Sequence, residues 1–109
     1  MISILRNPDI TDKLCFEMKD GDRICGKVCG YISNDLDLVI DQLEAEQELF
    51  YDGLVRSILS FVSLRGIDRA VFSIEDERKK YRLKGFRFIT EDSSVLEGIN
   101  KFFEEDTCG

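Results

Sequence analysis

The feature that most constrains the fold is a long amphipathic segment, residues 49–65, set between two apolar stretches. Its apolar side chains recur at three- and four-residue spacing, which predicts a helix, and Gly66 stands where a left-handed C-terminal cap belongs. The stretches on either side, residues 36–43 and 70–74, each predict a strand. Because a helix of this length allows a right-handed crossover, we expect these two strands to pair in parallel.

The first part of the chain predicts an antiparallel meander. A short strand is expected around Ile2 and Ile4, and residues 14–19 alternate apolar and polar side chains, as in a strand with one buried face. Gly21 sits in a hairpin turn signal, since glycine readily reaches the positive φ of such turns. The return strand, residues 23–33, is expected to direct two sets of side chains to opposite faces: Ile24, Val28 and Ile32 to one, and Cys25, Cys29 and Tyr31 to the other.

The last part predicts helix, strand and helix. Residues 75–84 form a charged helix with acids first, bases last and Gly85 as its cap. Phe86, Phe88 and Ile89 predict a strand. Ser93 is the expected N-cap of a final helix, whose apolar stripe comprises Val95, Leu96, Ile99, Phe102 and Phe103. The whole chain, residues 1–109, is therefore expected to form one α/β (α+β) domain with a mixed sheet, in which a meander leads into a β-α-β crossover and a C-terminal helix.

Composition excludes several classes of function. The net charge is −7, from 15 Lys and Arg against 22 Asp and Glu, which disfavours a nucleic-acid partner. The absence of histidine excludes Ser-His-Asp and Cys-His hydrolases. No apolar run approaches the roughly 20 residues that cross a bilayer, and no signal peptide is recognisable, so we expect no membrane partner and a cytoplasmic location.

The cysteines, at positions 15, 25, 29 and 108, are expected to be small apolar side chains in a reducing compartment. Cys25 and Cys29 would lie about 13 Å apart along one strand at ~3.3 Å per residue, which is too far for a disulfide. Without histidine or a Cys-x-x-Cys pair, no metal site is predicted.

The order of these elements, together with Tyr81-x-x-x-Gly85-Phe86 and the Arg65-Gly66-Ile67 helix end, resembles the GCN5-related N-acetyltransferases over roughly residues 14–90. The resemblance implies transfer of an acetyl group from acetyl-coenzyme A to an amine. It makes Tyr81 the candidate general acid for the departing thiolate and Glu44 a candidate base. The two helices that usually follow the first strand are missing, so the chain would be a form truncated on its N-terminal side.

The resemblance also locates the cofactor. In the family, a glycine-rich turn presents bare backbone N–H groups to the pyrophosphate at a helix N-terminus. Here that turn falls on residues 46–51, where Glu46 replaces the basic residue and Leu49 and Tyr51 replace the glycines. The positional candidates for cofactor binding are Leu43, Glu44, Ala45, Leu49, Phe50, Tyr51, Asp52 and Gly53. Because bulky and acidic side chains surround this turn, we expect acetyl-coenzyme A to bind weakly or not at all.

Two main hypotheses remain open at this point. The chain is an acyltransferase acting on an unknown amine acceptor, or it is a non-catalytic module of the same fold that binds a protein partner. Tyr81 has a corresponding alternative role, as an ordinary aromatic side chain packed beside the sheet. A third hypothesis, a structural metal- or thiol-binding protein, rests on the cysteines alone.

Overall fold

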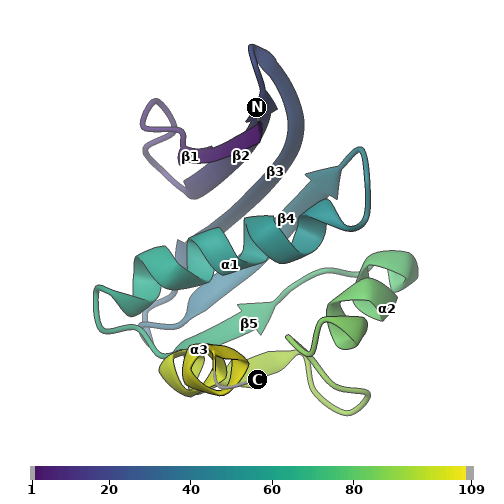
Figure 1. Cartoon of the computed structure of the whole chain (residues 1–109). Helices are drawn as coiled ribbons and strands as arrows, with labels where there is room; N and C mark the ends of the chain where they lie inside the picture. The colour runs from purple at the N-terminus through teal and green to yellow at the C-terminus, as the bar shows by residue number, and fades with distance from the viewer. Residues whose placement is uncertain (1, 108–109) are drawn as a thin grey trace.

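The computed structural model describes residues 2–107, which form a six-stranded sheet and three helices (Figure 1). The elements in chain order are β1 (Ile2–Arg6), β2 (Leu14–Asp20), β3 (Arg23–Ile32), β4 (Leu38–Ala45), α1 (Phe50–Ser63), β5 (Arg69–Phe72), α2 (Glu77–Gly85), β6 (Val95–Glu97) and α3 (Ile99–Thr107). The strands lie in the sheet in the same order as in the chain. The mixed α+β class is therefore confirmed.

The sheet is antiparallel except at one place. Strands β1 to β4 form the predicted meander, and β5 pairs antiparallel with β6. Between them, β4 and β5 pair in parallel, from Leu38↔Ala70 to Ile40↔Phe72. The parallel pair predicted from the long helix is thus confirmed, because α1 spans the distance that such a crossover requires.

Helix α1 lies across one face of the sheet and provides one side of the core (Figure 1). Its side chains Leu54, Ile58 and Leu59 are fully buried, as are Val28 and Ile40 on the strands. Burial of each such side chain contributes roughly 1.5–3 kcal/mol, so the amphipathic pattern accounts for the position of the helix. Gly66 has φ +87°, as a left-handed residue after a helix should.

The last helix begins later in the chain than predicted. Val95 and Leu96 belong to β6, and Gly98, with φ +76°, separates that strand from α3. Both apolar residues fit a helical stripe, but they pair instead with the edge of β5 at Val71 and Ala70. Ser93 is accordingly no helix N-cap. The edge of β5 takes these residues because its backbone groups otherwise lack partners.

The predicted strand at Phe86, Phe88 and Ile89 is also wrong, and so is the cap at Gly85. Helix α2 ends in a Schellman motif, in which the Phe88 N–H donates to the Leu83 carbonyl and the Arg87 N–H to the Lys84 carbonyl, each at 3.0 Å. Arg87 takes the left-handed conformation, with φ +70°. Phe88 and Leu83 are both buried in the core, which favours this closed turn.

The faces of β3 differ from the prediction at its start. The register shifts between Met18 and Lys19, which leaves Cys25 as an extra residue on β3. Cys25 therefore joins the core beside Val28, whereas Ile24 is half exposed. A bulge of this kind reverses the alternation of faces, which a strict two-residue period cannot anticipate. Among the described helices, none is long and apolar enough to cross a membrane.

Candidate functional site

The clearest candidate site is a gap between β4 and β5. Their pairing ends at Ile40↔Phe72, where the Ser73 N–H donates to the Ile40 carbonyl at 2.7 Å. Strand β4 then continues to Ala45, while the chain after β5 runs toward α2 (Figure 1). The gap holds a cavity of about 300 Å³, lined by Asp41, Gln42, Leu43, Glu44, Ser73, Ile74, Glu75, Asp76 and Lys79.

Asp41 lies at the point where β4 departs from regular pairing. The register between β3 and β4 shifts here, from Cys29↔Gln42 to Gly30↔Ile40, so Asp41 is an extra residue on β4. One of its carboxylate oxygens accepts from Lys13 Nζ at 2.6 Å. Its Oδ1 is buried and has no hydrogen-bond partner within the described part of the chain. The bulge thus brings a carboxylate with one unsatisfied oxygen to the gap.

The gap is acidic. Its lining holds four carboxylates, from Asp41, Glu44, Glu75 and Asp76, against the ammonium group of Lys79. Lys13, outside the lining, offsets the charge of Asp41, so the acids still outnumber the bases. Low-dielectric walls concentrate the field of such a set, so the cavity attracts cations and repels anions. A polyanionic ligand would have to overcome that field to enter.

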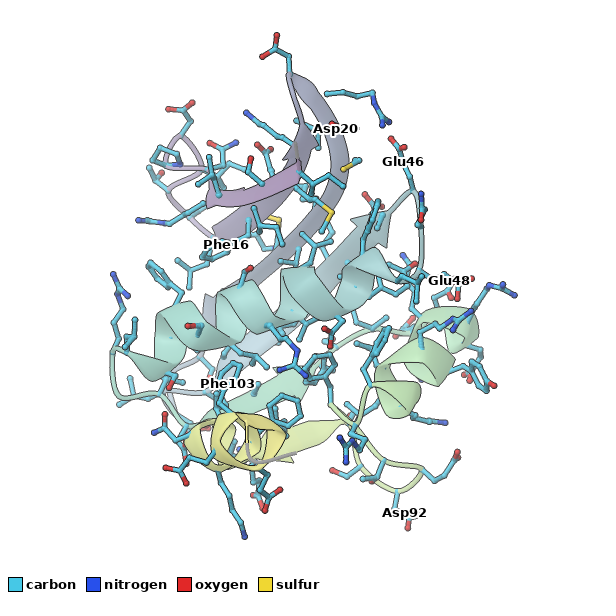
Figure 2. All side chains as sticks on the ribbon, viewed as in Figure 1. Phe16, Asp20, Glu46, Glu48, Asp92 and Phe103 are labelled. Carbon is cyan, nitrogen blue, oxygen red and sulfur yellow. A yellow bond between two sulfur atoms is a disulfide. The ribbon has the colours of Figure 1, made fainter. Side chains whose placement is uncertain are left out.

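A second arrangement lies beside the gap, at the start of α1. The Glu48 carboxylate accepts from the Nε atoms of Arg78 and Arg82, the latter at 2.5 Å. We call these three residues the Glu48 clasp, because they join the loop before α1 to α2. Figure 2 labels Glu48 in that loop. The hydrogen bonds from Arg82 and then Arg78 lower the pKa of Glu48 below its usual value. The carboxylate is therefore held ionised beside the N-terminus of α1.

The first turn of α1 is filled by side chains. Leu49 precedes the helix and is 67% exposed, and it makes no side-chain cap. Tyr51 is buried in the core, and this burial, with the charge of Glu48, raises the pKa of its phenol. A Cβ at Gly53 would lie 3.2 Å from Ile4 Cδ1, so the glycine allows β1 to approach the helix. Gly53 therefore serves packing on the β1 side, away from the gap.

The other positional candidates are divided between surface and core. Asp52 forms an ion pair with Arg56 along α1 at 3.0 Å. Phe50 is partly buried against the core, and Ala45 contributes to a separate shallow cavity beside β3. Leu43 is 1% exposed and reaches the gap from the core. Of the eight predicted cofactor positions, only Leu43 and Glu44 line the gap.

The two catalytic candidates lie in different surroundings. Glu44 lines the gap. Tyr81 is 70% exposed on α2 and lines two shallow cavities instead, one of them beside Glu48 and Arg78. The α2 side chain that reaches the gap is Lys79. The structure thus separates the tyrosine from the cavity in which the resemblance would put its chemistry.

Sequence reasoning missed the Glu48 clasp and the role of Asp41. The clasp had a signal: Arg78 and Arg82 are four residues apart on a predicted helix, so they share one face. Asp41 had none, because it reaches the gap through a bulge in the ladder between β3 and β4.

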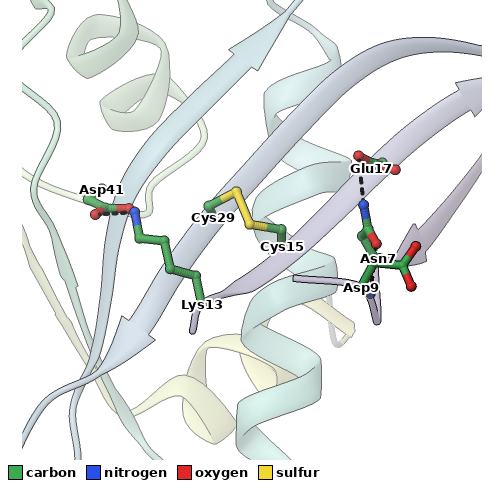
Figure 3. Close-up of a disulfide and its surroundings, with 7 residues drawn as sticks. All are labelled: Asn7, Asp9, Lys13, Cys15, Glu17, Cys29 and Asp41. Atoms are coloured by element: carbon green, nitrogen blue, oxygen red, sulfur yellow. Dashed lines mark hydrogen bonds and ion pairs between the residues drawn. A yellow bond between two sulfur atoms is a disulfide. The ribbon is translucent and has the colours of Figure 1, made fainter. Parts of the chain in front are cut away.

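The cysteine prediction requires a correction. Cys15 and Cys29 face each other on β2 and β3 and form a disulfide, with Cα atoms 4.2 Å apart (Figure 3). The prediction took into account only a cysteine pair within one strand, Cys25 and Cys29. Cysteines on two neighbouring strands can lie directly opposite each other, where side chains come closest. Cys25 is a buried free thiol, as expected, and Cys108 lies outside the described residues.

No family model matches this sequence, and no curated protein sequence matches it. Within residues 2–107, no group of three or more His, Cys, Asp or Glu side chains is arranged to hold a metal ion. The gap and the Glu48 clasp are therefore the features of the molecule that bear on its function.

Proposed function

We propose that this chain is a non-catalytic interaction module with an acetyltransferase-like architecture, whose coenzyme A site is closed from within. The observation that carries the proposal is the Glu48 clasp. In the family that the sequence resembles, the start of this helix receives the pyrophosphate. Here an internal carboxylate accepts from the Nε atom of each of the two guanidinium groups that stand beside that position.

The charges around the clasp support the same conclusion. Guanidinium groups that already donate to a carboxylate have fewer donors to offer a phosphate. Glu46, the neighbouring acid, forms an ion pair with Arg23 in the same way. The acidic gap adds repulsion along the path of the pantetheine arm. A protein partner that presents basic side chains would meet no such repulsion.

The test removes the internal carboxylate. Glu48→Gln frees Arg78 and Arg82, and it should strengthen binding of coenzyme A or inorganic pyrophosphate by about tenfold or more, most clearly at low salt. Glu77→Gln is the matched control, because Glu77 is 85% exposed and pairs only loosely with Lys80 at 3.7 Å. Calorimetric titration of both variants gives the comparison. Equal affinities for the two variants would contradict the closed-site proposal.

A second candidate function is acyl transfer to an amine, and the separation of β4 from β5 favours it. A gap between these strands is what the family needs to admit the thioester. In this case α2 has to move Tyr81 to the gap when the cofactor binds, because Tyr81 does not line the gap in this structure. Tyr81→Phe should then lower turnover ~10²-fold or more with little loss of stability, because an exposed side chain carries little packing. Glu44→Gln should remove the base and shift the pH profile. Unchanged turnover of acetyl-coenzyme A in both variants would exclude this function.

A cytosolic location is also part of the proposal. Cytosolic thiol buffers keep most cysteine pairs reduced, so in a cytosolic location the Cys15–Cys29 disulfide of this structure should be reduced to two thiols. Alkylation of freshly lysed cells followed by mass spectrometry measures this directly. A stable disulfide in that sample would point to an oxidising compartment.

A further inference from the structure

Strand β1 forms one edge of the sheet and lacks the usual protection of such an edge. It pairs with β2 on one side, and no strand among residues 2–107 pairs with its other side. Ile2 is 49% exposed and Leu5 is 62% exposed. In a chain with 34% charged residues, this strand has one charge, Arg6, and no proline or bulge. Exposed apolar edges of this kind are templates for pairing with another strand.

The hydrogen bonds of β1 show which backbone groups point outward. The Asn7 N–H, just after the strand, donates to the Cys15 carbonyl of β2 at 2.8 Å. Because alternate residues of a strand direct their backbone groups to opposite sides, Leu5 and Ser3 also bond to β2. The N–H and C=O groups of the remaining residues, Ile2, Ile4 and Arg6, therefore face the open edge.

We propose that this edge pairs with the same edge of a second copy of the chain, antiparallel about a two-fold axis at Ile4. Ile4 then lies opposite Ile4 of the second copy, and Ile2 lies opposite Arg6. In this register every outward N–H meets an outward C=O. The two sheets join into one continuous sheet, and the contact is isologous, as in most soluble dimers.

Side chains and charges fit this register. Ser3 lies opposite Leu5 of the second copy on the face away from α1, so the two exposed leucines come close together. Arg6 lies opposite Ile2, and its guanidinium remains over the Phe61 ring at 5.2 Å. No two like charges are opposed, whereas like charges directly across a ladder would destabilise it.

The other edge of the sheet is less suited to pairing. Strand β6 has three residues and includes the exposed acid Glu97, which pairs with Arg69 at 3.3 Å. A contact between β1 and β6 would also be heterologous and would build rings or open filaments rather than a two-fold dimer. The geometry thus favours a closed dimer through β1.

The dimer should be weak and should respond to salt. A single strand pair buries less than the 1,200–2,000 Å² or so of a stable interface. Each copy has a net charge of −7, so the copies repel one another at a distance. Added salt screens this repulsion and should strengthen the association.

Sedimentation equilibrium over a wide range of protein concentration tests the proposal. The average mass should rise from the 12.6 kDa of one chain toward twice that value, and it should do so at lower concentration when salt is added. Leu5→Lys brings two ammonium groups together at the contact and should weaken association by about tenfold or more. Leu64→Lys is the control with the same charge change, at a residue 83% exposed beyond the end of α1.

Ile2→Pro is an independent test of the pairing between β1 edges, because it removes an outward N–H without removing a hydrogen bond to β2. It should weaken association while the circular dichroism and thermal unfolding of the monomer stay close to those of the parent chain. A parent chain that stays monomeric at millimolar concentration would overturn the proposal. Larger assemblies, or equal association of the Leu5→Lys and Leu64→Lys variants, would overturn it too.

Discussion

Replacing Phe88 by alanine should destabilise the fold more than most single changes. Phe88 is 1% exposed, although it lies in a turn and not in a strand. Its ring lies 5.2 Å from that of Phe102 on α3 and 6.2 Å from that of Phe72 on β5, measured between centroids. The Arg56 guanidinium of α1 lies 5.9 Å from its centroid. One ring thus joins the end of α2 to both other helices and to the sheet.

The expected magnitude follows from this burial. Deleting a fully buried phenylalanine side chain costs about 3–5 kcal/mol, a large part of the 5–15 kcal/mol that stabilises a typical domain. Each kcal/mol lowers the melting temperature of a domain of this size by roughly 4–8 °C. Phe88→Leu keeps much of the volume and should cost only about 1–1.5 kcal/mol.

Urea unfolding followed by circular dichroism measures the free energy of unfolding of the parent chain, of Phe88→Ala and of Phe88→Leu. Phe103→Ala is the control, because Phe103 is only partly buried and its ring meets that of Phe102 at 5.7 Å. It should cost clearly less than Phe88→Ala. If Phe88→Ala cost less than about 1 kcal/mol, the packing assigned to this turn would be refuted.

Three further predictions concern acid stability, a close approach and the disulfide. The pKa of Glu48 is lowered in the fold, so the stability that its ionised carboxylate contributes is present above its usual pKa of 4.5 and is lost as pH falls through the lower folded pKa. Glu48→Gln should therefore make the melting temperature depend less on pH in that window. An unchanged dependence would contradict the clasp. Gly30→Ala would bring a Cβ within 2.4 Å of a carbonyl oxygen of β4 and should cost about 1–3 kcal/mol or more in urea unfolding, whereas Gly85→Ala meets no atom within 4 Å and should be neutral or stabilising. Reducing the Cys15–Cys29 bond, which closes a separation of 14 residues, should lower stability by about 2–4 kcal/mol, and equal melting curves with and without dithiothreitol would show that the bond is not formed.

Local patterns predicted the order and pairing of the elements in the first two thirds of the chain, but not the faces of β3 at its start. Each of these elements has a local signal in the sequence. Alternation around Phe16 and Met18 indicates β2, and the apolar stripe indicates α1. Gly21 indicates the turn after β2. The parallel pairing of β4 with β5 followed because the length of α1 leaves few other connections. In these elements the local pattern and the pairing of the strands agree.

The last third depended on contacts that a local pattern does not contain. Val95 and Leu96 suit a helix or a strand equally, and the free edge of β5 decides between them. Phe88 reads as part of a strand because it is apolar, yet a left-handed Arg87 turns it back onto Leu83. Tertiary packing overrides local propensity at such positions.

The candidate site was predictable in part. The resemblance drew attention to the loop before α1 and to the acids around it, which include Glu48. The partners of those acids could not be predicted from the sequence. In the structure Glu48 binds Arg78 and Arg82, which lie about thirty residues further along the chain. Asp41 entered the site through a bulge, a feature of strand register.

The most direct test of the closed-site proposal is a calorimetric titration of the unaltered chain with acetyl-coenzyme A at physiological salt. The Glu48 clasp and the acidic gap predict no binding tighter than about millimolar, since Glu48 already takes one donor from each guanidinium group and the gap repels a polyanion. Saturable binding at micromolar concentration would contradict the closed-site proposal and would favour acyl transfer as the function of this chain.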